Sequence, residues 1–192
     1  MPFTKMGNNP SQNPRSAGMT VTECDDMIQE SLRTPEVRSL KEHLEKAGCG
    51  IGDNFIKAVD CNVKISGGYY LGEGIIVCSN HMSNQEDVNQ VVKHELIHAY
   101  DECRAANMNW SDCAHQACAE IRANNLSGDC HFKRELLRGY LKLKDKGQHD
   151  LKECVRRRSM QSVLMNPSCH KHECHIIFFS ISSKDHYSML LL

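Results

Sequence analysis

The run His94-Glu95-Leu96-Ile97-His98 constrains the fold of this chain more than any other part of its sequence. Histidines four residues apart share one face of a helix, so both rings can reach one ion only if the segment is helical. Paired imidazoles of this kind are typical zinc ligands. Glu95 lies beside the metal's open position, where it can accept a proton from the attacking water. The run predicts His94 and His98 as zinc ligands and Glu95 as catalytic base; two surface histidines are the alternative.

The residues around this motif favour a helix packed on a small sheet. Ser83-Asn84-Gln85-Glu86 has the capping-box pattern, with Glu86 at the third helical position, and predicts a helix from there to about Arg104. Residues 67–71 and 74–78 are predicted strands of a hairpin. Zinc peptidases usually keep the edge strand that holds the substrate in this place. A separate apolar stripe for packing is formed by Val88, Val92, Leu96, Ala99 and Cys103.

A catalytic zinc needs a third protein ligand. The longer metzincin pattern H-E-x-x-H-x-x-G-x-x-H fails, because Asp101 and Arg104 occupy its glycine and third-histidine positions. Glu120 is the preferred ligand, since it lies on the next predicted helix, residues 112–126, as in two-helix zincins with a glutamate ligand. A salt bridge with Arg122 or Arg104 is the alternative role for Glu120.

Three other side chains compete for roles near the metal. His115 is the rival third ligand, but it lies about 140° around the helix from Glu120, so the two cannot both face one ion. Asp101 shares the metal face with His94, and we expect it to orient a ligating histidine. A contact at the C-terminal end of its helix is the alternative for Asp101. Asp129 is a remote candidate ligand.

Composition and length indicate one globular domain. The 192 residues carry 23 Lys and Arg against 24 Asp and Glu, which argues against a nucleic-acid partner. No run of about 18 apolar residues could span a membrane as a helix. Residues 49–66 are predicted as a loop. Further helices are predicted at residues 22–32, 35–47, 133–144 and 153–165.

These elements predict an α+β, zincin-like, disulfide-rich metalloprotease domain over residues 21–169, with its small sheet packed on the motif helix. Residues 1–20 and the atypical residues 170–192 are expected to be disordered tails. The run Cys169-His170-x-His172-x-Cys174-His175 has metal-binding residue types but no zinc-finger spacing. Arg156-Arg157-Arg158 is interpreted as a solvated helix face.

Eleven cysteines are unusual for a chain of this length. No pair has the C-x-x-C spacing of a zinc ribbon or a thioredoxin-like site, so we favour disulfides in an oxidising compartment. Most cysteines of the domain are therefore expected to be oxidised. The odd number leaves at least one cysteine unpaired within the chain.

Several longer blocks resemble the mitochondrial inner-membrane-associated metalloprotease family that processes a subunit of ATP synthase. The resemblance covers about Cys24 to Cys169. The blocks that carry it are Ser66-Gly67-Gly68-Tyr69, Val77-Cys78-Ser79-Asn80, residues 94–104, Trp110, residues 115–123, residues 126–130 and Cys154-Val155-Arg156.

The resemblance implies a zinc endopeptidase of the mitochondrial intermembrane space, peripheral on the inner membrane. Its protein substrate would be the precursor of the membrane-embedded ATP synthase subunit 6, and it would also assist ATP synthase assembly. Members carry many disulfide-bonded cysteines and no cleaved presequence. A non-catalytic assembly factor with a structural zinc site is the alternative, although such a factor would not need a base at Glu95.

The chain departs from the family pattern in three places. Ala58 stands where the family often has a cysteine, so Cys61 is a candidate unpaired thiol, as is Cys174. Gln116 stands where a second histidine often follows His115. Residues 170–192 differ from the family's usual ending, so the sequence gives no support for the family's C-terminal disulfide in this chain.

Overall fold

A three-stranded sheet supports the helix of the metal-binding motif. The computed structural model describes residues 18–140 and 151–170. The strands are β1 (Ile56–Val59), β2 (Gly67–Tyr70) and β3 (Gly74–Cys78), in the order β1-β3-β2. The predicted hairpin is confirmed, because β2 pairs antiparallel with β3. Among the described residues β2 is therefore an edge strand of the sheet, the kind of position where an extended peptide can pair.

The prediction of a continuous loop over residues 49–66 is wrong, because β1 lies inside it. β1 pairs parallel with β3, with Ile56 opposite Ile75 and Val59 opposite Cys78. Its four residues alternate between buried Ile56 and Ala58 and more exposed neighbours. This strand is too short to stand out as a pattern, and it exists because β3 supplies its hydrogen-bonding partner.

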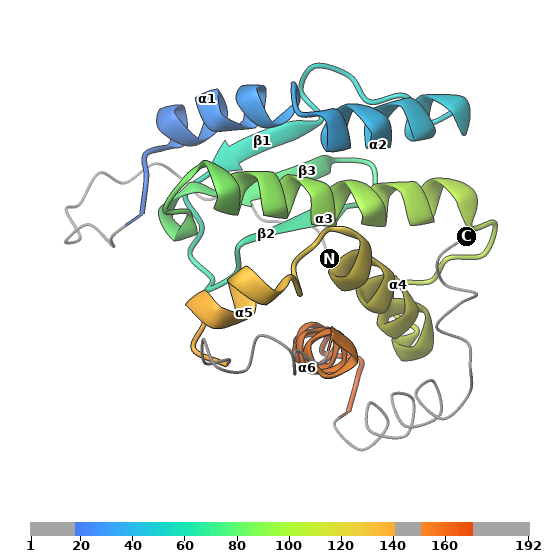
Figure 1. Ribbon diagram of the computed structural model, residues 1–192. Helices are drawn as coiled ribbons and strands as arrows, with labels where there is room; N and C mark the ends of the chain where they lie inside the picture. The colour runs from blue at the N-terminus through green and yellow to red at the C-terminus, as the bar shows by residue number, and fades with distance from the viewer. Residues whose placement is uncertain (1–17, 141–150, 171–192) are drawn as a thin grey trace.

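Three helices pack with the sheet: α1 (Val21–Ser31), α2 (Pro35–Lys46) and α3 (Gln85–Arg104). Figure 1 shows α3 running along the sheet, with α1 and α2 above it. All three helices agree with the predictions to within about two residues. The predicted cap of α3 is displaced by one position, because Asn84 rather than Ser83 is the N-cap and accepts from the Asp87 N–H. A 3-10 turn at Ser79–His81 links the sheet to α3.

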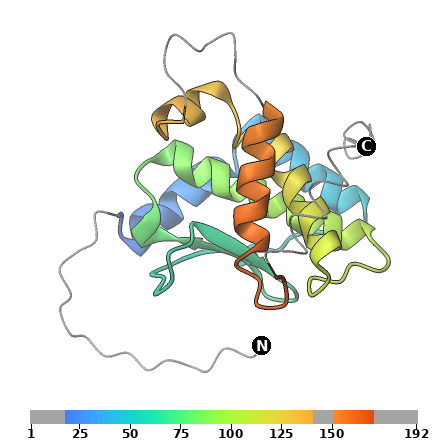
Figure 2. The same ribbon diagram turned by 90° about the horizontal axis from the view of Figure 1, so that it is seen from below.

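The remaining helices are α4 (Cys113–Leu126), α5 (Phe132–Leu137) and α6 (Leu151–Val163), and they lie below α3 (Figure 1). Seen from below, α6 lies alongside α4 (Figure 2). α5 is shorter than the predicted helix over residues 133–144, of which residues 141–150 lie outside the described part. The predicted tails, residues 1–20 and 170–192, fall almost wholly outside the described residues.

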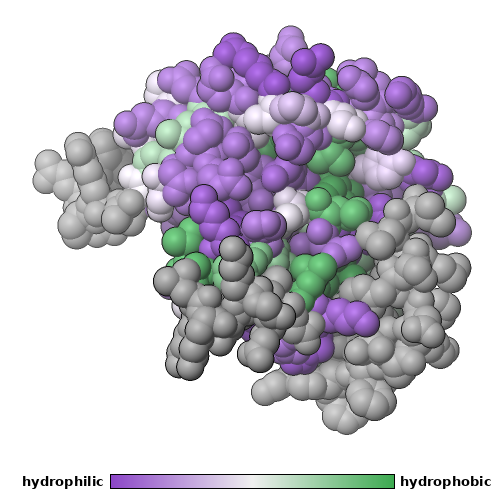
Figure 3. All heavy atoms as spheres, viewed as in Figure 1, coloured by the Kyte–Doolittle hydropathy of each residue, from purple (hydrophilic) through white to green (hydrophobic). Residues whose placement is uncertain are grey.

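The described residues form two hydrophobic cores, one above the site and one below it. The upper core joins α1, α2, the sheet and α3, and includes Val88, Val92 and Leu96 of the predicted stripe. The lower core joins α4 to α6 around Ile121 and Val155. Figure 3 shows hydrophobic side chains in the hollow below α3, whereas the outer faces of α1 and α2 are mostly hydrophilic. The site therefore lies between two separately packed halves.

Four disulfides cross-link the described residues, two within the upper half and two within the lower half: Cys49–Cys103, Cys61–Cys78, Cys113–Cys169 and Cys130–Cys154. The prediction that most domain cysteines are oxidised is confirmed. Among the described cysteines, Cys24 and Cys118 are free. The prediction of an unpaired Cys61 is wrong, because the parallel pairing of Val59 with Cys78 brings Cys61 beside Cys78. Cys174 lies outside the described residues.

Within the described ranges, no helix has the length and apolar character needed to cross a membrane.

Candidate metal centre

The structure brings His94, His98 and Glu120 together from two helices. Their ligand atoms all lie within 4.8 Å of one another. Nε2 of His94 lies 3.4 Å from Oε2 of Glu120, and Nε2 of His98 lies 3.5 Å from Oε1. Ligand atoms about 2.0–2.2 Å from a tetrahedral zinc ion lie about 3.3–3.6 Å apart. The two imidazole nitrogens and the carboxylate of Glu120 thus lie close enough together to bind one metal ion.

Local structure accounts for this meeting of side chains. The four-residue spacing on α3 turns both imidazoles toward α4. Asp112 caps α4 by accepting from the N–H groups of Ala114 and His115, which fixes where the helix starts and which face carries Glu120. Glu120 and His98 are both less than 10% exposed, and His94 is partly exposed. The triad is thus open to the solvent on the His94 side.

Electrostatics in this metal-free site follow from burial and proximity. Burial opposes the charged forms of both His94 and Glu120, but their mutual hydrogen bond and charges outweigh it. The pKa of His94 is raised to about 9, and the pKa of Glu120 is lowered well below its ordinary value. Glu120 is therefore ionised at neutral pH, which is the form that binds a cation.

Glu95 lies next to the triad but outside the group of ligand atoms. Its side chain is buried, and burial raises the pKa of its carboxyl, although His94, His98 and a backbone hydrogen bond from Tyr69 act in the opposite direction. Tyr69 belongs to the edge strand β2. This contact puts the predicted base at the junction of the motif helix and the strand that a substrate could extend.

Two side chains that sequence patterns did not reveal hold Glu120 in place. Ser162 of α6 donates a 2.6 Å hydrogen bond to Oε1 of Glu120. Asn124, one turn after Glu120, contacts Oε2 at 3.4 Å and also donates to Ser159 of α6. Only the spacing of Asn124 from Glu120 was visible in the sequence, because α6 follows much later in the chain.

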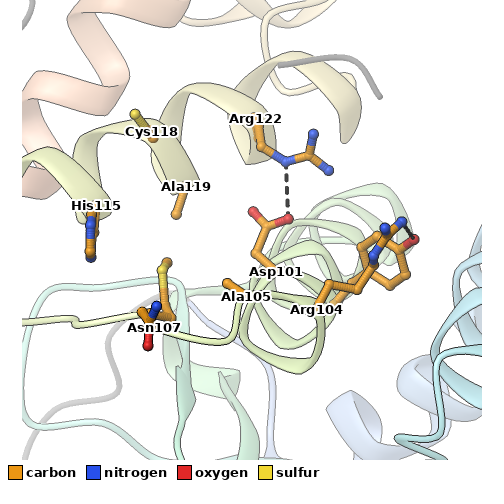
Figure 4. Close-up of a pocket in the computed structure, with 10 residues that line it drawn as sticks. Asp101, Arg104, Ala105, Asn107, His115, Cys118, Ala119 and Arg122 are labelled. Carbon is orange, nitrogen blue, oxygen red and sulfur yellow. Dashed lines mark hydrogen bonds and ion pairs between the residues drawn. The ribbon is translucent and has the colours of Figure 1, made fainter. Parts of the chain in front are cut away.

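Asp101 bridges the two ligand helices, although it does not bond to a ligand directly. Its Oδ1 accepts a 3.0 Å hydrogen bond from Nε of Arg122 on α4, as Figure 4 shows. Asp101 also attracts His98 electrostatically. Oδ2 of Asp101 and Nδ1 of His98 are both buried without a hydrogen-bond partner. The predicted orienting role of Asp101 therefore stays a prediction. Arg122 pairs with Asp101, so the alternative salt bridge between Arg122 and Glu120 does not form among the described residues.

The other two candidate ligands have different partners, although Asp129 lines the same cleft as His94 and Glu120. Nδ1 of His115 accepts from the backbone N–H of Asn109, and His115 lines a separate pocket between α3 and α4 (Figure 4). Asp129 is buried and paired with Arg138 and Arg158. Neither belongs to the group of ligand atoms. Arg104 contacts the hydroxyl of Tyr100 rather than Glu120.

Two smaller predictions also change. The interpretation of residues 156–158 as a solvated face is correct for Arg156 but wrong for Arg157 and Arg158. Arg157 pairs with buried Glu135, and Arg158 pairs with buried Asp129, because α6 packs against the segment after α4. In the C-terminal run, Cys169 is bonded to Cys113, and residues 171–175 lie outside the described part.

A cleft of about 440 Å³ opens in front of the triad. One wall comes from residues 64–67 and α3, and the other from α4, α6 and the residues around α5. His94, Glu95 and Glu120 all line it. A metal held by the triad would therefore face this cleft.

Comparisons with known protein sequences all identify the same family of proteases. Residues 22–180 match the model of the peptidase M76 family. The mitochondrial inner membrane protease atp23 of Schizosaccharomyces pombe is 33% identical over 164 residues, covering 85% of this chain and 86% of that protein. No solved structure matches.

Two further relatives are longer than this chain. The Homo sapiens homologue of mitochondrial inner membrane protease ATP23 is 38% identical over 161 residues, covering 81% of this chain and 63% of that protein. The Yarrowia lipolytica protease ATP23 is 36% identical over 136 residues, covering 71% and 53%. The chain thus spans between about half and nine-tenths of these relatives' lengths.

Proposed function

Because the chain belongs to the peptidase M76 family, we propose that it is a zinc-dependent endopeptidase with His94, His98 and Glu120 as metal ligands and Glu95 as base. One observation carries this assignment: the two oxygens of Glu120 face the Nε2 atoms of both motif histidines at separations that suit a tetrahedral ion.

The bound zinc would acidify a water molecule and polarise the scissile carbonyl. The protein's own groups hold the substrate and transfer the protons. The free edge of β2 pairs with the substrate backbone and holds it extended across the cleft. The Glu95 carboxylate accepts the proton of the attacking water and then passes it to the leaving amine. Its raised pKa suits the first of these steps, since a more basic carboxylate accepts the proton more readily.

For the substrate and location we propose what the resemblance implies. The relatives are named mitochondrial inner membrane proteases. The chain would act in the intermembrane space, peripheral on the inner membrane, on the precursor of a membrane-embedded ATP synthase subunit, and would assist assembly of that enzyme. Four disulfides support an oxidising compartment of this kind.

The test is Glu95→Gln in the full chain, with zinc content and precursor cleavage measured together. The amide has nearly the same size and cannot accept the proton, so zinc stays bound while cleavage falls by about 10²–10⁴. Glu42→Gln, an exposed change on α2, is the matched control. Cleavage by Glu95→Gln at near the parent rate would reject Glu95 as the base, whereas a zinc-loaded parent chain that cleaves no precursor would favour the non-catalytic assembly factor with a structural zinc site.

A further inference from the structure

A cluster of arginines shares the cleft with the metal-binding triad. Arg134, Arg138 and Arg158 line the same cavity as His94 and Glu95. Arg134 belongs to α5, Arg138 follows its last turn, and Arg158 projects from α6. Their side chains are only 19–29% exposed. Three cations are thus concentrated in a partly desolvated groove, where charge interactions are stronger than at an open surface.

Two buried carboxylates neutralise most of this charge. Arg138 donates to Asp129 at 2.5 Å and to Glu135 at 3.1 Å. Arg158 also pairs with Asp129, and Arg157 pairs with Glu135. Asp129 and Glu135 therefore already pair with three guanidinium groups besides Arg134.

Arg134 is left without a hydrogen bond among the described residues. Its Nε lies 3.4 Å from Oδ1 of Asp129, and this atom is buried with no hydrogen-bond acceptor. Its other two contacts, with Asp87 and Glu86, are longer, at 3.6 and 3.9 Å. Both of those acids are more exposed, so water screens their attraction. A guanidinium has five N–H groups in a planar fork, and Arg134 is one of the residues that line the cleft.

The neighbouring Arg158 is affected by a second guanidinium as well as by its carboxylate partner. Burial lowers the pKa of Arg158, and nearby Arg138 acts in the same direction, so that together they outweigh the attraction of Asp129. An additional anion in this part of the cleft would relieve that repulsion and supply the acceptor that Arg134 lacks.

We propose that Arg134, supported by Arg138 and Arg158, binds a carboxylate of the peptide substrate. The cleft would then select peptides that carry Asp or Glu a few residues from the scissile bond. This inference rests on the proposed protease function. The position of the cluster favours a peptide, because the same cleft is lined by Ser66 and Gly67 next to the free edge of β2.

The experiment compares matched peptides that differ at one position, Asp against Asn or Glu against Gln, scanned on both sides of the scissile bond. We expect the parent chain to prefer the acid at one position by about tenfold or more in kcat/KM, the usual scale of a charged hydrogen bond. Arg134→Gln should bring this ratio close to one. Arg134→Glu should reverse it toward a Lys-containing peptide. Arg33→Gln, whose side chain is 71% exposed, should keep the parent ratio.

Binding to the zinc-loaded Glu95→Gln protein gives a readout that does not depend on turnover. Each peptide is measured by fluorescence anisotropy, with Arg134 intact or changed to Gln, after melting temperature and zinc content show that both proteins are folded. One set has an internal acid and an amidated C-terminus, and the other a neutral sequence and a free C-terminal carboxylate. Arg134-dependent preference for either set identifies which carboxylate is bound.

Equal binding and cleavage of acidic and neutral peptides by the parent chain would overturn the inference. So would an equal loss for both peptides in Arg134→Gln. A chain that binds acidic peptides through Arg134 but cleaves none would refute the protease function and leave the carboxylate site standing.

Discussion

Ser162 on α6 donates a hydrogen bond to Oε1 of Glu120 on α4, and this oxygen is the one that faces Nε2 of His98. The contact joins a helix that carries no predicted ligand to the ligand set. A hydrogen bond of this kind orients the carboxylate before the metal arrives. The lower core and two disulfides hold α6 in the place that this contact requires.

Ser162→Ala is therefore expected to weaken zinc binding without unfolding the chain. The loss of a partner of a ligand typically costs about 10–100-fold in metal affinity. Competition with a chromophoric chelator measures the affinity, and Ser39→Ala, an exposed change on α2, is the matched control. Unchanged affinity in Ser162→Ala would show that α6 does not orient Glu120.

Substitution of the ligands themselves separates metal binding from proton transfer. His94→Ala and His98→Ala should lose zinc, because two protein ligands do not hold a catalytic zinc tightly. Glu120→Gln keeps an oxygen but loses the charge, so zinc affinity and activity should fall together to an intermediate level. Bound zinc per chain is read by atomic absorption after gel filtration. Full zinc occupancy in Glu120→Gln would instead point to a different third ligand.

The disulfides give a count that can be checked directly. Eight of the eleven cysteines are bonded in pairs, so the denatured, unreduced protein should show no more than three free thiols. More than three would contradict the four disulfides, and nine or more would refute a disulfide-bonded domain altogether. Replacing Cys130 and Cys154 by Ser should destabilise the chain by about 2–5 kcal/mol in urea unfolding. Zinc affinity should fall with it, because α6 carries Ser162. Ser replacement of free Cys24 serves as the comparison.

Asp129 should contribute stability that depends on pH. Burial opposes its charge, but Arg158 and Arg138 outweigh this and lower its pKa below the ordinary value of 3.8. A carboxyl with a lowered pKa in the folded state stabilises the protein above its unfolded pKa, and the stabilisation is lost as the pH falls through the folded pKa. Asp129→Asn should cost about 3–5 kcal/mol at pH 7, because several guanidinium groups lose their partner.

That difference between the parent chain and Asp129→Asn should shrink below about pH 4, where the carboxyl of the unfolded chain begins to protonate while the folded one is still ionised. Urea unfolding at a series of pH values measures it. Asp26→Asn, an exposed change on α1, should be nearly neutral throughout. A difference that stays constant from pH 7 to pH 2 would mean that Asp129 does not act through its charge.

Sequence alone was sufficient wherever the information is local. The motif helix follows from a four-residue spacing within one segment, and the β2–β3 hairpin follows from a glycine-flanked turn between two short apolar runs. Glu120 was predicted as a ligand from its place on the next helix. The high number of cysteines without C-x-x-C pairs indicated disulfides, although it did not say which cysteines pair.

Tertiary structure decided the contacts that join distant segments. β1 forms only because β3 lies beside it, and the same pairing brings Cys61 to Cys78. Ser162 reaches Glu120 across 42 positions of sequence, and Arg158 reaches Asp129 because α6 packs against α4. Periodicity shows which face of a helix is apolar, but not which other helix covers that face. The sequence therefore pointed to the residues at the centre of the site. The residues that support them could be found only once the packing of α6 against α4 was known.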